Sequence, residues 1–195
     1  MEEIKFVTEK NNDREYVLKK VAEDGKLLDM ASDILKDDEE VVMKAVECKG
    51  EALEFASDRL KNDKNIVMES VRKIGWTICY ASEKLRSNKD IIMAAVKIDG
   101  QALYYASQDL RDNKQIVLEA VKNKGLILKY ASNRLRKDKE IVVEAIKSDK
   151  RAKEYIASQE LKQDEDILKL LEWFYIIKFN WIKNIKTSET KKNDI

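Results

Sequence analysis

The chain has 195 residues, of which 38 are basic, 37 are acidic and none is histidine, so its formal net charge is only +1. The absence of histidine removes the commonest general base at neutral pH and the commonest imidazole metal ligand. The balanced charge argues against a general nucleic-acid binder, which carries a strongly basic surface. The first residues include acidic side chains and lack the apolar stretch of a secretory signal peptide. We therefore expect a cytoplasmic protein, either of the producing cell or of a host cell into which it is delivered.

Residues 1–12 precede the regular part of the sequence. They carry the apolar residues Ile4, Phe6 and Val7 among mostly polar ones. The end of a stacked array needs a covering segment with a polar outer face. We expect residues 1–12 to form an N-terminal cap.

An internal repeat of 25 residues begins near residue 13. A fixed period of this length is typical of repeat proteins, in which each unit packs against its neighbours. We expect residues 13–163 to form one elongated array of about six units. The repeat is marked by the five glycines of the chain, Gly25, Gly50, Gly75, Gly100 and Gly125.

Each unit is predicted to begin with an amphipathic α-helix. Twelve residues before each glycine stands an Asp or Asn, whose side chain can accept a backbone N–H at a helix N-terminus. Apolar residues recur three, four, seven and eight positions later, which places them on one helix face. We expect the glycine to end this helix in the left-handed conformation. The predicted N-caps are Asp13, Asp38, Asp63, Asn88, Asn113 and Asp138, with Asp164 one residue late.

A second short helix is predicted after each glycine. It repeats a leucine, an aromatic residue and an alanine at fixed positions, as in Leu103, Tyr105 and Ala106. Two helices of about ten residues are too short to be stable alone and must bury their apolar faces against neighbouring units. The sequence therefore predicts an all-α fold, an α-solenoid of about six stacked short helical hairpins.

Residues 164–186 are predicted to form an aromatic-rich C-terminal helix, and residues 187–195 a flexible tail. We expect the helix to cover the exposed core of the last unit. A dimer contact and a membrane-surface helix are the alternatives. Charged residues such as Lys169, Glu172 and Lys178 are too frequent for a transmembrane span. The aromatic residues of this segment are Trp173, Phe174, Tyr175, Phe179 and Trp181.

No set of residues points to catalysis, a metal or a cofactor. Carboxylates stand at the predicted caps or at variable polar positions, and glycines spaced by whole units cannot form a phosphate-binding loop. Cys48 and Cys79 occupy different repeat positions, which favours two free thiols. A serine recurs in every unit, and such regularity favours a structural role. It is found at Ser32, Ser57, Ser82, Ser107, Ser132 and Ser158.

Apolar residues replace polar ones at two repeat positions in the third to fifth units. Trp76 and Leu126 occupy the position directly after a glycine, and Cys79 and Tyr104 occupy the position three residues later in their units. Residues three apart share a helix face, so these side chains could form one apolar patch. Aromatic anchors of this kind carry protein interfaces. The sequence predicts a candidate partner-binding patch of Trp76, Cys79, Tyr104 and Leu126, with packing against a neighbouring unit as the alternative.

A basic residue also recurs once per unit and could form a ladder for an acidic peptide or a phosphate backbone. The structural alternative is that these cations complement helix dipoles and pair with the capping aspartates. Charge is polarised along the chain, because residues 1–50 carry a net −5 and residues 101–150 a net +4. The candidate polyanion-binding residues are Lys61, Arg86, Arg111 and Arg136, joined from the other helix by Arg72, Lys97, Lys122 and Lys147.

Three recurring segments resemble the repeats of the family called domain of unknown function 4116. They are Val-Val-Met-Lys-Ala-Val at 41–46, Gly-Gln-Ala-Leu-Tyr-Tyr-Ala-Ser at 100–107 and Leu-Arg-Asp-Asn-Lys at 110–114. The resemblance covers about six units and implies an all-helical repeat array without assigned catalytic residues. It also implies a module found in proteins of host-associated microbes. Two departures, Lys150 in place of glycine and an extra residue before Ala157, predict a distorted last unit.

Together these features predict a non-catalytic protein–protein interaction module, either an adaptor or an inhibitor supplied by a microbe or its mobile elements. Stacked helical units present an extended surface whose variable positions can change without disturbing the core. RNA or another polyanion bound along the basic ladder is the first alternative. Self-assembly through the C-terminal helix is the second.

Overall fold

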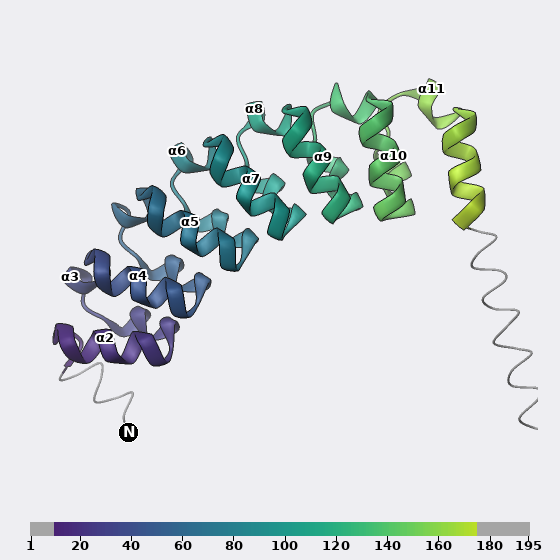
Figure 1. The fold of residues 1–195 in the computed structure, drawn as a ribbon. Coiled ribbons are helices and arrows are strands. Elements are labelled where there is room, and N and C mark those ends of the chain that lie inside the picture. Colours follow the sequence, from purple (N-terminus) through teal and green to yellow (C-terminus); the bar gives the residue numbers. More distant parts are fainter. Residues whose placement is uncertain (1–9, 175–195) are drawn as a thin grey trace, which may run out of the picture.

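The computed structural model describes residues 10–174 (Figure 1). The apolar residues expected to form the N-terminal cap lie outside these described residues. So do the second half of the expected C-terminal helix and the expected tail.

The repeats stack side by side into a curved arc, which begins at α2 and ends beyond α11 (Figure 1). No strand occurs between residues 10 and 174, so the predicted all-α fold is confirmed. Each unit contributes one ten-residue α-helix to the stack. These helices are α2 (Arg14–Glu23), α4 (Glu39–Cys48), α5 (Lys64–Lys73), α7 (Lys89–Ile98), α9 (Lys114–Asn123) and α10 (Lys139–Ser148).

The second segment of each unit is a six-residue 3₁₀-helix rather than a ten-residue helix. A short turn of helix follows it and lies along the outer rim of the arc where it is labelled in Figure 1. The 3₁₀-helices are η2 (Gly25–Met30), η3 (Gly50–Phe55), η5 (Gly75–Tyr80), η6 (Gly100–Tyr105), η7 (Gly125–Tyr130) and η9 (Lys150–Tyr155). The short turns are α3 (Asp33–Lys36), η4 (Leu60–Asn62), α6 (Glu83–Arg86), α8 (Gln108–Arg111), η8 (Leu135–Lys137) and α11 (Gln159–Lys162).

Extended backbone at the alanine and serine positions explains why the second helix stops early. Ala81 has φ −71° and ψ 154°, and Ser82 has φ −57° and ψ 155°. The Ser82 N–H therefore donates to the carbonyl oxygen of Lys61 in the preceding unit, at 2.9 Å, instead of continuing its own helix. The serine Oγ then accepts the Leu85 N–H and caps the next turn.

The predicted α-helix N-caps are confirmed. Asp38 Oδ1 accepts the backbone N–H groups of Glu40 and Val41, both at 3.0 Å. These bonds satisfy donors that the first helical turn leaves without a partner. The same side-chain capping occurs at Asp13, Asp63, Asn88, Asn113, Asp138 and Asp164.

The prediction that glycine ends the α-helix in a left-handed conformation is wrong. None of the five glycines has a positive φ, and each is the first residue of a 3₁₀-helix. Glycine is needed instead because two backbones meet there. A Cβ on Gly75 would collide with the carbonyl oxygen of Ala95 in the next unit and would lie 2.8 Å from the Asp99 nitrogen.

One continuous apolar core runs from Val17 to Ile167. Residues 165–174 are helical, with Ile167 buried in this core and Leu170 and Phe174 packed against it. As far as Phe174, the C-terminal helix thus covers the last unit. No helix within the described range is long and apolar enough to cross a membrane.

The last unit accommodates its extra residue locally. Ala157, not the following serine, donates its N–H to the carbonyl oxygen of Arg136, at 3.1 Å. Ser158 keeps its capping role and accepts the Leu161 N–H at 3.2 Å. The expected distortion is a shift of one residue in the contact between units.

Replacing Gly75 tests the close approach of the backbones. Gly75→Ala is expected to lower the free energy of unfolding by about 1–3 kcal/mol, because the new methyl group overfills the contact. Gly75→Asn is expected to be no better, although Asn is the best substitute for a left-handed glycine. Chemical denaturation measures both values. Lys153→Ala in the exposed part of η9 is the control and should change stability by less than about 0.5 kcal/mol. A Gly75→Asn variant clearly more stable than Gly75→Ala would restore the left-handed interpretation.

Candidate functional site: an aromatic groove beside unpaired arginines

Half-buried aromatic side chains close the six-residue 3₁₀-helices η3, η5, η6, η7 and η9. Because the helix stops at these residues, each ring packs its inner side on the core and leaves its outer side at the surface. Stacking places the rings of successive units along one face of the array. They belong to Phe55, Tyr80, Tyr105, Tyr130 and Tyr155.

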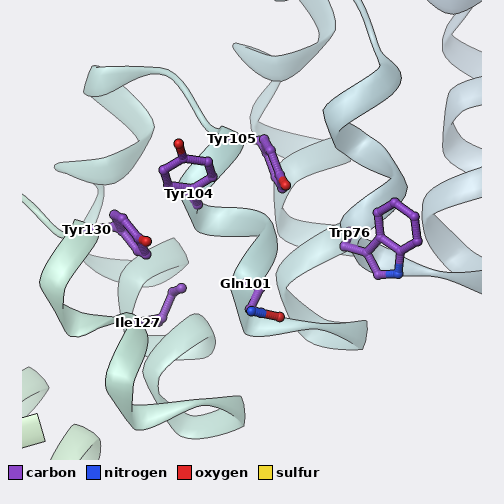
Figure 2. A pocket seen from close by; sticks show the side chains of 6 residues that line it. All are labelled: Trp76, Gln101, Tyr104, Tyr105, Ile127 and Tyr130. Carbon is purple, nitrogen blue, oxygen red and sulfur yellow. The ribbon is translucent and has the colours of Figure 1, made fainter. Parts of the chain in front are cut away.

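A groove of about 460 Å³ opens on this face across the third to fifth units (Figure 2). We call it the aromatic groove. Tyr104 lies between Tyr105 and Tyr130, with ring centroids 4.9 and 4.7 Å away in edge-on contacts. Tyr104 is nevertheless 52% exposed, a large fraction for so large a side chain. The groove is lined by Trp76 of η5, Gln101, Tyr104 and Tyr105 of η6, and Ile127 and Tyr130 of η7.

Two of the four residues of the predicted patch belong to this groove. Trp76 and Tyr104 line it, whereas Cys79 and Leu126 are half-buried and do not. Sequence reasoning missed Tyr105 and Tyr130, because the regularity of their repeat position favoured packing. The structure shows that a half-buried ring both packs and lines a groove. Ile127 is buried, and nothing in the sequence singles it out.

Burial favours the neutral forms of the thiol and phenol groups on this face. It raises the pKa of the Cys79 thiol and of the Tyr105 phenol above their usual ranges. Burial, together with a hydrogen bond to Glu54, raises the pKa of Tyr80 to about 12. The Tyr80 hydroxyl donates to Glu54 Oε2 at 3.0 Å. The phenols are therefore hydrogen-bonding groups at neutral pH, and Cys79 is a protonated thiol.

Two further grooves continue from the aromatic groove. One, of about 360 Å³, is also lined by Tyr104 and Tyr105 and reaches Arg86 and Arg111. The other groove, of about 470 Å³, shares Tyr130 with the aromatic groove. It also shares Arg111 with the groove of about 360 Å³. Shared lining residues make the three grooves one continuous surface.

The structure divides the predicted basic ladder into two separate rows. Arg86 and Arg111 lie in the groove beside the tyrosines, and Lys61 is half-buried at the equivalent position. The other four residues stand in the last turns of α5, α7, α9 and α10, at the opposite end of helices that are about 15 Å long. Arg72 lines a different groove, with Met43 and Met68. The remaining three are the exposed residues Lys97, Lys122 and Lys147.

The expected pairing of the ladder with the capping aspartates is not observed. These aspartates pair instead with the first α-helical residue of the preceding unit. The distances are 2.8 Å for Arg14–Asp38, Lys114–Asp138 and Lys139–Asp164. In contrast, Nε of Arg86, Arg111 and Arg136 is buried without a hydrogen-bond partner.

The recurring serines link neighbouring units. Ser107 and Ser132 donate backbone N–H groups to the carbonyl oxygens of Arg86 and Arg111, at 3.2 and 3.0 Å. The serine hydroxyls are engaged in caps and contacts between units, as Ser82 Oγ shows by donating to Asn62 Oδ1 at 2.7 Å.

Between residues 10 and 174 no three Cys, Asp or Glu side chains gather as a metal site would require.

These features define an α-solenoid repeat protein with a grooved aromatic and basic face. A family model described as Domain of unknown function (DUF4116) matches residues 13–61, 38–86, 63–111 and 113–156. The first three matches advance by one repeat of 25 residues, and together the matches cover most of the chain. The chain belongs to this family. Comparison with curated proteins and with solved structures found no match.

The raised pKa of Tyr80 gives a measurable prediction. Glu54→Gln removes the nearby negative charge and should lower the Tyr80 pKa from about 12 toward the usual value of about 10. Absorbance of the phenolate during a pH titration measures this change, and a Tyr80→Phe variant isolates the signal. Because the folded-state pKa lies above the unfolded one, Tyr80 should reduce stability as pH rises from about 10 to about 12 and leave it unchanged below. A Tyr80 that ionises near pH 10 in the folded protein would contradict the buried, hydrogen-bonded geometry.

Proposed function

We propose that this protein is a non-catalytic protein-binding module whose partner docks on the aromatic groove. The observation that carries the proposal is the position of Tyr104. Its ring is held by two neighbouring tyrosines and yet is half exposed at the centre of an open groove. Large, rigid aromatic side chains at the centre of a surface patch are the residues that dominate protein interfaces.

Stacking supports this function because it fixes the groove before a partner arrives. Trp76, Tyr104 and Ile127 come from three successive units, and each unit is packed on the next through a shared core. A preformed site loses little conformational entropy on binding, so more of the contact energy appears as affinity.

The biological role we propose is that of an adaptor or inhibitor of microbial or mobile-element origin. Its site of action would be the cytoplasm of the producing cell, or of a host cell after delivery. The support for this origin is the resemblance to the repeat family, which implies a module found in proteins of host-associated microbes. An adaptor or an inhibitor needs only a binding surface.

Binding of RNA or another polyanion is a second candidate, favoured by Arg86, Arg111 and Arg136, whose Nε atoms are buried without a hydrogen-bond partner. It requires affinity that falls steeply with salt concentration. Self-assembly through the C-terminal helix is a third, favoured by Trp173, which is 55% exposed. It requires a sedimentation coefficient that rises with protein concentration.

Removing the two aromatic anchors tests the proposed function. Trp76→Ser combined with Tyr104→Ser should weaken partner binding by about 30-fold or more, as loss of interface hot spots does. The measurement is affinity capture of the full tagged chain from cells that produce it, with nuclease present, followed by a titration with the captured partner. Circular dichroism should show unchanged helix content, because neither Trp76 nor Tyr104 belongs to the buried core.

The matched control removes two apolar side chains elsewhere. Ile34 and Ile98 are 72% and 50% exposed and do not line the aromatic groove. Ile34→Ser with Ile98→Ser should bind the partner as the unchanged chain does. Equal loss of binding in both double variants would place the interface elsewhere, as would full binding by the Trp76 and Tyr104 variant.

A further inference from the structure

Three arginines stand at equivalent positions of successive units, and we call Arg86, Arg111 and Arg136 the arginine ladder. Each has a buried Nε with no hydrogen-bond partner, and no carboxylate of residues 10–174 forms an ion pair with any of them. Other arginines close by behave differently. Arg134 Nε, for example, lies 3.2 Å from Asp112 Oδ1. The arginine ladder therefore carries positive charge that its surroundings leave unmatched.

The arginine ladder is held in place by the contacts between units. The carbonyl oxygens of Arg86, Arg111 and Arg136 accept backbone N–H groups of the next unit, at 3.2, 3.0 and 3.1 Å. With the backbone fixed and Nε buried, the side chain is confined before any ligand binds. A confined guanidinium is suited to a carboxylate, because its planar fork can donate two parallel hydrogen bonds.

Two members of the arginine ladder, Arg86 and Arg111, lie in a groove that is continuous with the aromatic groove. Tyr104 and Tyr105 line both the aromatic groove and the groove that contains Arg86 and Arg111. A single extended ligand could therefore place an apolar side chain against Trp76 and Tyr104 while its charged groups reach the arginines.

We propose that this surface binds an extended acidic segment of a partner protein. The inference rests on the proposed function and adds the chemistry of the partner. Packed helices are about 8–10 Å apart, so arginines of successive units are separated by about that distance. Three residues of a polyproline II segment rise about 9 Å and return the side chain to the same face. A segment with Asp or Glu at every third position thus matches the spacing of the arginine ladder.

The charge around the arginine ladder favours an acidic peptide over a nucleic acid. Glu83 lines the same groove as Arg86, and exposed Glu54 lies beside Tyr80. Residues 1–50, at the N-terminal end of the chain, carry a net charge of −5. A polyanion that extended beyond the arginine ladder toward this end would be repelled, whereas a short peptide can place its few carboxylates opposite the arginines alone.

The test begins with selection from a random 12-residue peptide library displayed on phage, using the full chain as bait. We expect the enriched peptides to carry Asp or Glu at every third position and an apolar residue near one end. An enriched peptide is then synthesised with a fluorescent label, beside a copy in which Glu is replaced by Gln and Asp by Asn. Fluorescence anisotropy should show affinity at least about tenfold lower for the neutral copy, because charge-assisted hydrogen bonds are lost.

Protein variants locate the binding surface. Arg86→Gln with Arg111→Gln and Arg136→Gln should lower affinity for the acidic peptide at least about tenfold. Arg111 borders two of the grooves, so Arg111→Gln alone should cause part of this loss of affinity. This single variant provides the test if the triple variant folds poorly. The matched control is Lys97→Gln with Lys122→Gln and Lys147→Gln, which removes the same charge from the far ends of the α-helices and should leave affinity within about twofold.

Three results would overturn the acidic-segment inference. The first is that the enriched peptides lack acidic residues, or that their affinity for the protein is unaffected by the Arg→Gln changes. If these peptides nevertheless fail to bind the Trp76→Ser, Tyr104→Ser double variant, the proposed function survives without the acidic partner. The second is selection of no peptide at all, in which case capture of a folded partner decides the proposed function separately. The third is a labelled 20-nucleotide oligouridylate that binds more tightly than any selected peptide and depends on the same arginines.

Discussion

The close approach of backbones between consecutive units is the constraint from which the rest of the structure follows. At each glycine the 3₁₀-helix lies against the carbonyl oxygen of the next α-helix, so closely that a Cβ would not fit. One backbone hydrogen bond per unit, from the serine or its neighbour to the preceding unit, lies beyond the other end of the 3₁₀-helix. A unit of this size cannot bury its apolar face alone, and these contacts bring each face into a shared core.

The same constraint determines which side chains remain available for function. The backbone turns outward after the aromatic residue in order to make the hydrogen bond between units, which leaves each ring at the surface. The residue that follows each glycine and the fifth residue of each six-residue 3₁₀-helix are not buried in the shared core. These positions differ from unit to unit, and two of them provide Trp76 and Tyr104. The arginine ladder stands where the chain leaves the short outer turn, and its carbonyls anchor the next unit.

Much of this architecture could be predicted from the sequence, because capping and helical periodicity are local. Asp38 and its equivalents cap their helices through contacts within one helical turn, independently of how the units pack. The apolar positions of α4 follow the helical period over ten residues. The 3₁₀ character of η6 could not be predicted, since six residues do not distinguish a period of 3.0 from one of 3.6. The role of Gly75 could not be predicted either, because a left-handed turn and a close backbone contact both require glycine.

The candidate site was only half predictable for a physical reason. Trp76 and Tyr104 stand out because they break the polar pattern of their repeat positions. Tyr105 and Tyr130 conform to the repeat, and the sequence alone gives no means of telling a fully buried ring from a half-buried one. The split between the two basic rows depends on where the short outer turns lie relative to the α-helices, which is a property of the stacked array.

A crystal structure of the full chain with an acidic library-selected peptide would decide between the possible binding surfaces. We expect an extended peptide along η5, η6 and η7, with carboxylates within hydrogen-bonding distance of Arg86 and Arg111 and an apolar side chain against Trp76 and Tyr104. The stacked units should superpose on those of the free chain, since the site is preformed. A peptide bound along α4 and α5, beside Met43, Met68 and Arg72, would contradict this account, as would units that separate to admit it.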